Sequence, residues 1–227
     1  CIVTLSWVFF TLFGMLPFYL SGSIDSLTNA FFETMSGFTT TGATILDDIE
    51  SLSHGMLFWR SLTQWIGGLG IVFFTIAVLP VFTSGGVQLF SAESTGVTHD
   101  RTHPKINVMA KWLWTVYLIL TLAETILLML GGMSLFDAVC QSFATTATGG
   151  YSTKQASISY WNSPFIEYVV AIFMLLSGVN FALFLMCLRG KVSRLLRDEE
   201  LRWFLGSVAI LTFLITFALV FQNHYDW

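Results

Sequence analysis

The sequence predicts an all-α integral membrane protein built from repeated units, each consisting of a helix, a re-entrant pore loop and a second helix. Composition gives the first indication. Of the 227 residues, 55% are hydrophobic and 11% are charged, and the mean hydropathy is +0.73. These values lie outside the range of ordinary soluble domains. Long apolar stretches and an internal repeat give the other two indications.

Five apolar stretches are long enough to cross a membrane, since a spanning helix needs roughly 20 apolar residues. Lipid offers no partner for backbone N–H and C=O groups, so continuous stretches of this length must form helices. The strands of a membrane barrel would be shorter and would alternate in polarity. The five stretches cover about 1–20, 57–82, 112–131, 165–188 and 203–222.

The layout of charge predicts the orientation in the membrane. Eight of the ten Lys and Arg residues fall in or beside the connectors 83–111 and 189–202, which the positive-inside rule places in the cytoplasm. The connectors 21–56 and 132–164 hold six acidic residues against Lys154 alone. We therefore expect a multi-pass protein whose two acidic connectors are extracytoplasmic.

Part of the chain repeats after 108 residues (150 − 42 = 108). Without a gap, "SLTNAFFETMSGFTTTGAT" lies over "SLFDAVCQSFATTATGGYS", with Thr40 on Thr148 and Gly42 on Gly150. The same shift, continued through the next helix, places Gly70 on Gly178. The repeat predicts a first pore-loop unit with its connector at 1–105, a second unit at 106–200 and the first helix of a third at 201–227.

Each acidic connector contains a short stretch typical of a helix, Asp25 to Phe38 and Ser134 to Thr145. Ser23 or Asp25 can cap the first helix, and Ser134 can cap the second. At about 1.5 Å per residue each helix is about 20 Å long, too short to span the bilayer. Non-helical backbone at that depth is tolerated only where protein buries it or where it lines a wet cavity. We therefore expect re-entrant segments at about 23–46 and 134–153.

The polar strips that follow the short helices, 39–44 and 146–153, suit the coordination of a monovalent cation. Gly42 and Gly150 permit backbone angles that other residues avoid. A row of carbonyl oxygens can replace the hydration shell of the ion, and the negative end of each short helix adds favourable potential. The candidate ion-coordinating residues are Thr40, Thr41, Gly42, Ala43, Thr148, Gly149, Gly150 and Tyr151.

Charged residues near the first strip suggest two supporting roles. Asp47, Asp48 and Glu50 would form an acidic outer vestibule that concentrates cations. Arg60 either extends to the membrane interface or bonds to the pore-loop carbonyls or to Glu33. Because a fixed cation in the ion path would repel the ion, we predict that Arg60 and Glu33 support the strip from behind.

Glu124 lies in the middle of the spanning stretch 112–131, where carboxylates are usually functional. Under the shift of 108 its counterpart is Leu16, so the first unit has no equivalent. We interpret Glu124 as a protonated or hydrogen-bonded structural residue.

Thr148-Gly149-Gly150-Tyr151 resembles the Thr-Val-Gly-Tyr-Gly filter of potassium channels, with Gly149 in place of Val and Ser152 in place of the last Gly. Six further motifs are spread along nearly the whole chain: "LPFYLSG" (16–22), "FTTTGAT" (38–44), "FWRSLTQWIGGLGI" (58–71), "GMSLFDA" (132–138), "ATGGYST" (147–153) and "GVNFALF" (178–184). Through these motifs the sequence resembles the TrkH subunits of the bacterial Trk/Ktr/HKT potassium uptake systems.

The resemblance implies potassium uptake across the bacterial inner membrane. It implies four potassium-channel-like repeats, pseudo-fourfold around the ion pathway, with Gly42 and Gly150 as the first two filter glycines. In the family a glycine at the first position goes with potassium selectivity and a serine with sodium permeation, so Gly42 favours potassium. The resemblance also implies a homodimer regulated by a cytoplasmic, nucleotide-binding, TrkA-like ring. We expect a longer chain, because the sequence begins without Met and stops at Trp227 just after a membrane helix.

Other functions fit the sequence less well. A channel or transporter for sodium or mixed monovalent cations is the main alternative. A membrane enzyme lacks support, since no HExxH or GxSxG motif and no close carboxylate pair at membrane depth is present. A neutral-solute channel would place its re-entrant loops on opposite faces, and a two-repeat channel would not begin a third repeat at 201–222. The Cys and His spacings suggest no metal motif, and we expect membrane lipid but no cofactor and no nucleic acid as partners.

Overall fold

The computed structural model describes residues 2–70, 106–180, 183–184 and 198–223. The chain divides into two compact units, Cys1–Gly178 and Val179–Trp227, which we describe separately. The described elements are all helical, as the sequence predicts. Unit 1 contains α1 (Ile2–Gly14), α2 (Leu16–Leu20), α3 (Leu27–Phe38), α4 (His54–Gly68), α7 (Ile106–Leu130), α8 (Leu135–Thr146), the 3-10 helix η1 (Ser157–Trp161) and α9 (Pro164–Gly178), and unit 2 contains α12 (Glu199–Asn223).

Two of the described helices are long and apolar enough to cross a membrane, and they match two predicted stretches. They cover Trp112–Leu130 in α7 and Glu199–Phe221 in α12. The predicted stretch 1–20 forms α1 and α2, which are separated at Met15 just before Pro17. The stretches 57–82 and 165–188 begin in α4 and α9. Their later parts, and most of the connectors 83–111 and 189–202, lie outside the described residues.

The two short helices have the predicted length and the predicted spacing. Both α3 and α8 have 12 residues, and their first residues, Leu27 and Leu135, are 108 apart (135 − 27 = 108). Ser134 caps α8 by accepting a hydrogen bond from the Asp137 backbone N–H at 3.1 Å, as predicted. The predicted cap of α3 is wrong: Ser26, rather than Ser23 or Asp25, accepts from the Asn29 N–H.

The spacing changes to 110 outside the short helices and the strips. Gly22 and Gly132 both have positive φ and both follow an apolar helix (132 − 22 = 110). Ser53 and Ser163 both precede the next helix, and the backbone carbonyl of each accepts a hydrogen bond from the N–H four residues later. Gly178 therefore matches Gly68, the last residue of α4, and its predicted match with Gly70 is wrong. The linkers between the elements differ in length by two residues, which a single ungapped shift cannot represent.

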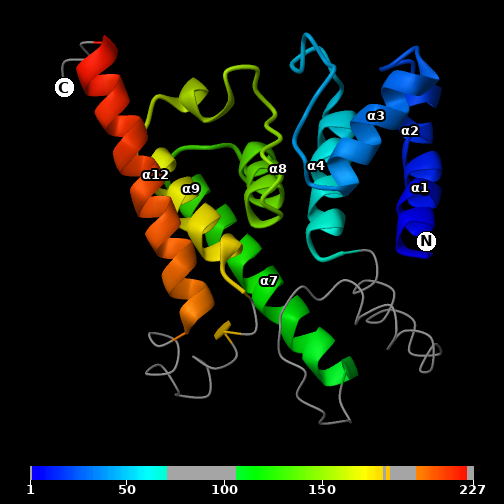
Figure 1. The fold of residues 1–227 in the computed structure, drawn as a ribbon. Helices are drawn as coiled ribbons and strands as arrows, with labels where there is room; N and C mark the ends of the chain where they lie inside the picture. Colours follow the sequence, from blue (N-terminus) through cyan, green and yellow to red (C-terminus); the bar gives the residue numbers. More distant parts are fainter. Residues whose placement is uncertain (1, 71–105, 181–182, 185–197, 224–227) are drawn as a thin grey trace. The chain divides into compact units, whose positions relative to one another are not determined.

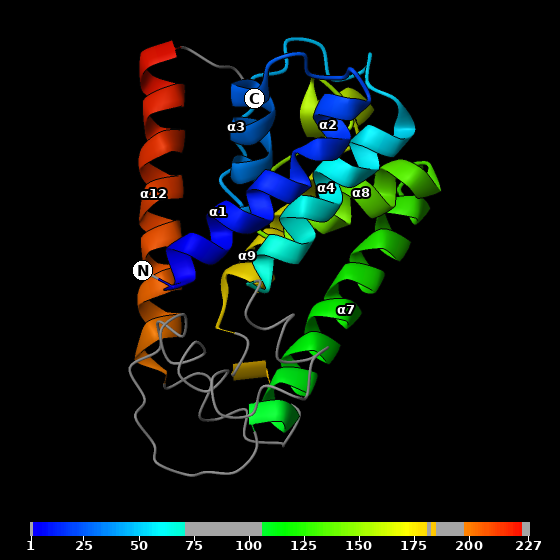
Figure 2. The ribbon, with the colours of Figure 1, turned by 90° about the vertical axis from the view of Figure 1, so that its right-hand side faces the viewer.

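Helix α4 connects the two halves of unit 1, α1–α4 and α7–α9. In the first half α3 packs against α1 and α4, and in the second α8 packs against α7 and α9 (Figures 1 and 2). Helix α4 also packs against α8, and Gly67 and Gly68 let the end of α4 lie close to the ends of α3 and α8 respectively. A Cβ atom at Gly67 would collide with the Phe38 carbonyl, and one at Gly68 would lie 2.7 Å from the Ala147 Cα. The C-terminal ends of both short helices therefore meet at the end of α4.

Candidate functional site

The two polar strips leave their helices through the same backbone hydrogen bonds. Thr40 and Thr148 adopt positive φ angles of 52° and 56°, and Gly42 and Gly150 adopt 75° and 89°. A positive φ is unusual for a β-branched residue and marks a strained turn, a feature that often accompanies function. The matched bonds are Thr39 N–H to Met35 O, Thr40 N–H to Gly37 O and Thr41 N–H to Ser36 O in the first strip, and Ala147 N–H to Phe143 O, Thr148 N–H to Thr145 O and Gly149 N–H to Ala144 O in the second.

The two strips approach each other at their glycines. A Cβ atom on Gly42 would collide with the carbonyl oxygen of Gly149. A Cβ atom on Gly149 would collide with the side chain of Gln64, which comes from α4. At Gly150 space is open, and the positive φ alone favours glycine. Position 42 therefore requires glycine for two reasons: its φ is positive, and the second strip approaches it closely.

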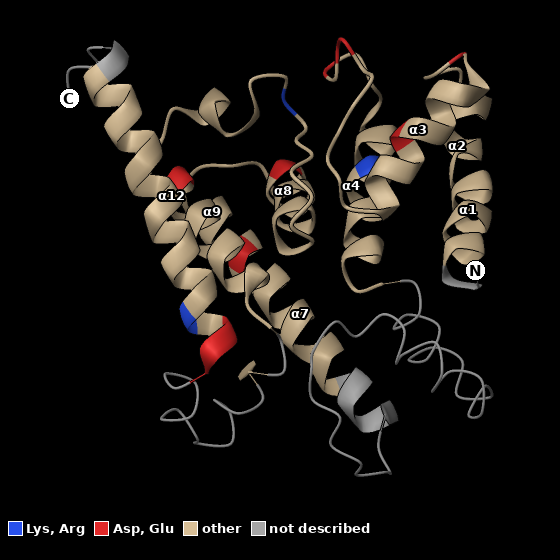
Figure 3. Ribbon diagram, in the orientation of Figure 1, with Lys and Arg blue, Asp and Glu red and all other residues tan. Residues whose placement is uncertain are grey.

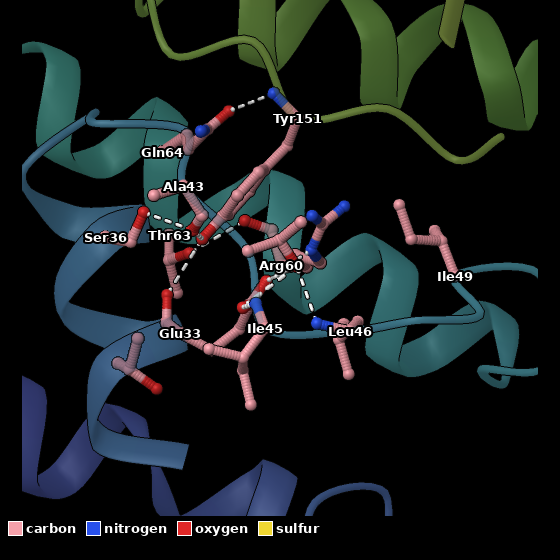
Figure 4. Close-up of polar contacts among 12 residues, drawn as sticks. Glu33, Ser36, Ala43, Ile45, Leu46, Ile49, Arg60, Thr63, Gln64 and Tyr151 are labelled. Atoms are coloured by element: carbon pink, nitrogen blue, oxygen red, sulfur yellow. Dashed lines mark hydrogen bonds and ion pairs between the residues drawn. The ribbon is translucent and has the colours of Figure 1, made fainter. Parts of the chain in front are cut away.

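The carbonyl of Ala43 is engaged by side chains. It accepts a hydrogen bond from the Ser36 hydroxyl at 2.6 Å and lies 3.2 Å from the Tyr151 hydroxyl (Figure 4). The Tyr151 hydroxyl has one hydrogen, which it can donate either to this carbonyl or to that of Glu33, so Ser36 is the donor that engages Ala43 in either case. The sequence predicted Ala43 as an ion-coordinating residue, but its carbonyl points into protein, and we leave it out of the coordinating set.

Tyr151 inserts its side chain from the second strip into the first half of unit 1. The residue is 1% exposed. Its hydroxyl lies 2.9 Å from the Glu33 carbonyl oxygen, within reach of a hydrogen bond, and its backbone N–H donates to the Gln64 Oε1 at 3.1 Å (Figure 4). The side chain of Tyr151 thus joins the two halves, a role that the sequence did not indicate for it.

Glu33 and Arg60 form a buried ion pair behind the first strip. The Arg60 Nε lies 2.7 Å from the Glu33 Oε1, and the side chains are 2% and 0% exposed. Figure 3 shows the corresponding acidic and basic positions of α3 and α4 adjacent to each other. Arg60 is too deeply buried to extend to the membrane interface, so that alternative is wrong.

Both partners of the ion pair also bind the strips, Glu33 at the end of the first and Arg60 in the second. The Glu33 carboxylate accepts from the Thr44 hydroxyl at 3.0 Å and from the Ile45 N–H at 3.1 Å. The Arg60 guanidinium donates to the Ser152 carbonyl at 3.0 Å and lies 3.7 Å from the centre of the Tyr151 ring. Charge-assisted bonds of this kind are shorter and stronger than neutral ones. The pair therefore connects both strips to α3 and α4.

The acidic residues predicted for the outer vestibule lie in the exposed loop between the first strip and α4. Asp47, Asp48 and Glu50 are all exposed. Asp48 is used within its own turn, where Oδ1 accepts from the backbone N–H of Glu50 at 3.1 Å. Glu50 pairs with Lys154 of the second connector at 3.8 Å. Part of the acidic charge is thus offset, and the two acidic connectors contact each other.

Gln64 is a site residue that sequence reasoning left out of the predicted support. It lies one helical turn after Arg60 on α4 and is 0% exposed. The four-residue spacing from Arg60 was the available signal, since residues i and i+4 share a face of a helix. Only the folded chain places its amide beside Gly42 of the first strip and Gly149 of the second.

Glu124 is buried in the seam between α7 and α8. Thr146, the last residue of α8, donates to the Glu124 Oε2 at 3.5 Å. Thr125 and Ser142 are hydrogen-bonded nearby at 3.0 Å. The Glu124 Oε1 has no hydrogen-bond partner among the described residues, and the interpretation of Glu124 as a protonated or hydrogen-bonded structural residue stays a prediction.

The helical fold, the apolar spans and the paired helix-and-strip segments define a class, the all-α membrane proteins with short helices that stop within the fold. Comparison with known proteins gives the particular family. A family model for TrkH, described as a cation transport protein, matches residues 1–223. The chain belongs to the TrkH family of cation transport proteins.

Individual relatives agree with this assignment. The chain is 44% identical to the Trk system potassium uptake protein TrkH of Escherichia coli K12 over 99% of this chain and 47% of that protein. It is 35% identical to TrkG of the same organism over 98% and 47%. The crystal structure of the potassium transporter TrkH from Vibrio parahaemolyticus matches with a TM-score of 0.80 and 36% identity, over 100% of this chain and 46% of that one. The chain spans about half the length of the curated relatives it matches.

Proposed function

We propose that the chain contributes two filter segments to a pathway for potassium uptake across the cell inner membrane. The observation that carries the proposal is the pair of strips, which leave α3 and α8 through matched hydrogen bonds and approach each other at Gly42 and Gly149. Two successive glycine-containing strips that share one backbone conformation are suited to present carbonyls toward one path. The names of the relatives, which are potassium uptake proteins, support potassium as the ion.

The proposed coordinating groups are the backbone carbonyls of Thr40, Thr41, Gly42, Thr148, Gly149, Gly150 and Tyr151. Such oxygens replace the water shell of a potassium ion, so that dehydration is offset by protein oxygens along the path. The buried side chain of Tyr151 also joins the two halves, and Glu33 and Arg60 hold the strips from behind. Asp47, Asp48 and Glu50 provide an acidic approach that raises the local concentration of cations.

The same proposal extends to the membrane topology, the repeat units and the assembly of the complete protein. We infer extracytoplasmic acidic connectors and cytoplasmic basic connectors, and the units 1–105, 106–200 and 201–227 as successive pore-loop repeats. The complete protein would form a homodimer controlled by a TrkA-like nucleotide-binding ring. It would act as a transporter rather than as an enzyme, with lipid around it and no cofactor.

The experiment that tests the proposal is the substitution Gly42→Ser in the complete protein, expressed in cells that lack their own potassium uptake. A serine Cβ collides with the Gly149 carbonyl and strains the positive φ, so the spacing of the carbonyls changes. We expect the ratio of rubidium uptake to sodium uptake to fall by about tenfold, which corresponds to about 1.4 kcal/mol of discrimination. An unchanged ratio would contradict the filter assignment. A wild-type protein that carries sodium as well as rubidium would favour the mixed-cation alternative.

A further inference from the structure

Gln64 extends from α4 into the space between the two strips. Its side chain is fully buried, and its Oε1 accepts the hydrogen bond of the Tyr151 backbone N–H at 3.1 Å (Figure 4). This bond identifies the oxygen end of the amide, because only an acceptor can face an N–H group. The second strip is therefore held at one backbone position by a side chain of the first half.

The same amide contacts the glycines of both strips. A Cβ atom on Gly149 would collide with the Gln64 Cδ and would lie 2.6 Å from both Oε1 and Nε2. A Cβ atom on Gly42 would lie 3.9 Å from the Gln64 Nε2. Gln64 thus fills the space in which a larger residue at position 149 would have to lie, and its nitrogen lies beside the first filter glycine.

The nitrogen end of Gln64 is unusual. Within the described part of the chain, the buried Nε2 has no hydrogen-bond partner. A buried donor without a partner destabilises the folded state, and this cost offsets part of what the bond between Oε1 and the Tyr151 N–H contributes. The position of the amide between the glycines gives a different reason for its presence.

We propose that Gln64 is a specificity-determining positioning residue, which fixes the separation of the two strips through its bond to Tyr151 N–H and its packing against Gly149. The inference rests on the proposed function. Potassium and sodium differ in size, so carbonyls that are free to move inward can also coordinate the smaller ion. By keeping the second strip from shifting relative to the first, Gln64 favours the larger ion.

Two substitutions test the role of the amide oxygen in the complete protein. Gln64→Met keeps the length and removes both polar ends, and we expect the rubidium-to-sodium uptake ratio to fall by about tenfold, the effect of losing one buried hydrogen bond. Because a buried carboxyl group favours its neutral form, Gln64→Glu keeps an uncharged oxygen acceptor for the Tyr151 N–H and should stay within about threefold of wild type. An unchanged ratio in Gln64→Met overturns the proposal, and equal losses in both variants overturn the role of the oxygen.

Trp59→Phe is the matched control on the same helix. It also removes one hydrogen bond from α4 to a backbone carbonyl, that of Gly14 at 3.0 Å, on the face directed toward α1. Its uptake ratio should stay within about twofold of wild type. A loss as large as that of Gln64→Met would mean that any loosening of α4 alters selectivity, and would overturn the specific role of Gln64.

A double-mutant cycle tests the contact between Gln64 and Gly149. Gly149→Ala should lower the uptake ratio when Gln64 is present, because the new Cβ displaces the amide. In the Gln64→Ala background that collision is absent, so Gly149→Ala should have little further effect. Additive losses would overturn the contact as the determinant of spacing.

The failure of this inference and the failure of the proposed function give different results. Wild-type protein without rubidium uptake contradicts the proposed function. Normal wild-type uptake with unchanged ratios in the Gln64 variants contradicts only the inference. Uptake is normalised to the amount of protein in the membrane. If Gln64→Met does not accumulate, Gln64→Asn replaces it with the same expected loss, since its shorter side chain withdraws the amide from Tyr151.

Discussion

The contact between α1 and α3 and the contact between α7 and α8, which we call the seams behind the two short helices, join helices of matching position but differ in their side chains. In the first half, Gly14 of α1 faces the end of α3, where a Cβ atom would lie 2.6 Å from the Phe38 ring and 2.9 Å from the Thr34 Cγ2. In the second half, Glu124 takes the place of Gly14 (124 − 14 = 110) and Thr146 takes the place of Phe38 (146 − 38 = 108). A small residue opposite a large ring has become a long polar residue opposite a small hydroxyl.

This difference shows that the two halves share the combined volume of the paired side chains and the backbone conformation, but not the residue types. Close-packed seams tolerate a change on one side only when the other side compensates. It also corrects the predicted counterpart of Glu124, which is Gly14 and not Leu16. The sequence comparison missed the pair because the shift between the halves is 110 before the short helices and 108 within them.

The support behind the strips differs in the same way. Glu33 matches Gln141 (141 − 33 = 108), and Arg60 matches Val170 (170 − 60 = 110). Glu33 has a cationic partner and binds the Thr44 hydroxyl and the Ile45 N–H, whereas Gln141 is neutral and donates only to Thr145 at 3.3 Å among the described residues. Among the described residues, the buried ion pair thus belongs to the first half alone, although its guanidinium also holds the carbonyl of Ser152 in the second.

The largest effect should come from removing one member of the ion pair. Arg60→Met leaves the Glu33 carboxylate buried with only the Thr44 hydroxyl and the Ile45 N–H, and we expect a loss of about 3–5 kcal/mol in the free energy of unfolding. Unfolding of the complete protein in mixed detergent micelles would measure it. The double variant with Glu33→Met should recover part of the loss, since no unpaired charge remains. A loss below about 1 kcal/mol in Arg60→Met would contradict the pair as a major support.

A smaller effect should follow from filling the seam of the first half. Gly14→Ala places a methyl group against the Phe38 ring, and we expect a loss of about 1–3 kcal/mol from overpacking. Phe38→Leu in the same chain should relieve it. The matched substitution in the second half, Glu124→Gln, keeps an oxygen for the Thr146 hydroxyl and should cost less than about 1 kcal/mol. Equal losses at the two positions, in the same unfolding measurement, would contradict the difference between the seams.

The smallest effects should come from the helix caps, where the two halves are most alike. Ser26→Ala and Ser134→Ala each remove an N-cap and should cost about 1 kcal/mol. The loss at Ser134 should be the larger, because its hydroxyl also donates to the Asp137 carboxylate at 2.7 Å and its cap bond is shorter, 3.1 Å against 3.5 Å at Ser26. Loss of helical circular dichroism on heating would measure both. A larger loss at Ser26 would contradict this ranking.

Features that depend on local chain properties could be predicted from the sequence. Apolar length predicts helices at α7 and α12, and the Ser134 cap predicts the start of α8. The spacing of 108 between Gly42 and Gly150 predicts that both adopt related conformations, and their φ angles of 75° and 89° agree. The positive φ angles of Thr40 and Thr148 were not predicted, because threonine by itself favours extended backbone.

Contacts across long sequence separations could not be predicted. The Tyr151 hydroxyl reaches the carbonyl of Glu33, 118 residues away, and the Gln64 amide reaches the backbone of Tyr151, 87 residues away. The Ala43 carbonyl was predicted to face an ion, and the Ser36 and Tyr151 hydroxyls engage it instead. Nothing in the residues around Ala43 indicates this, because one of the two partners belongs to the second strip.

The sequence by itself determined the helical membrane class, the two short helices and the matched glycines, since these depend on hydrogen bonds between residues near in the chain and on burial in lipid. Only the tertiary structure decided which carbonyls remain available, which side chains hold the strips and how the seams are filled. Those outcomes depend on the packing of α4 against both short helices. Close packing is a property of pairs of surfaces, and no single segment specifies it.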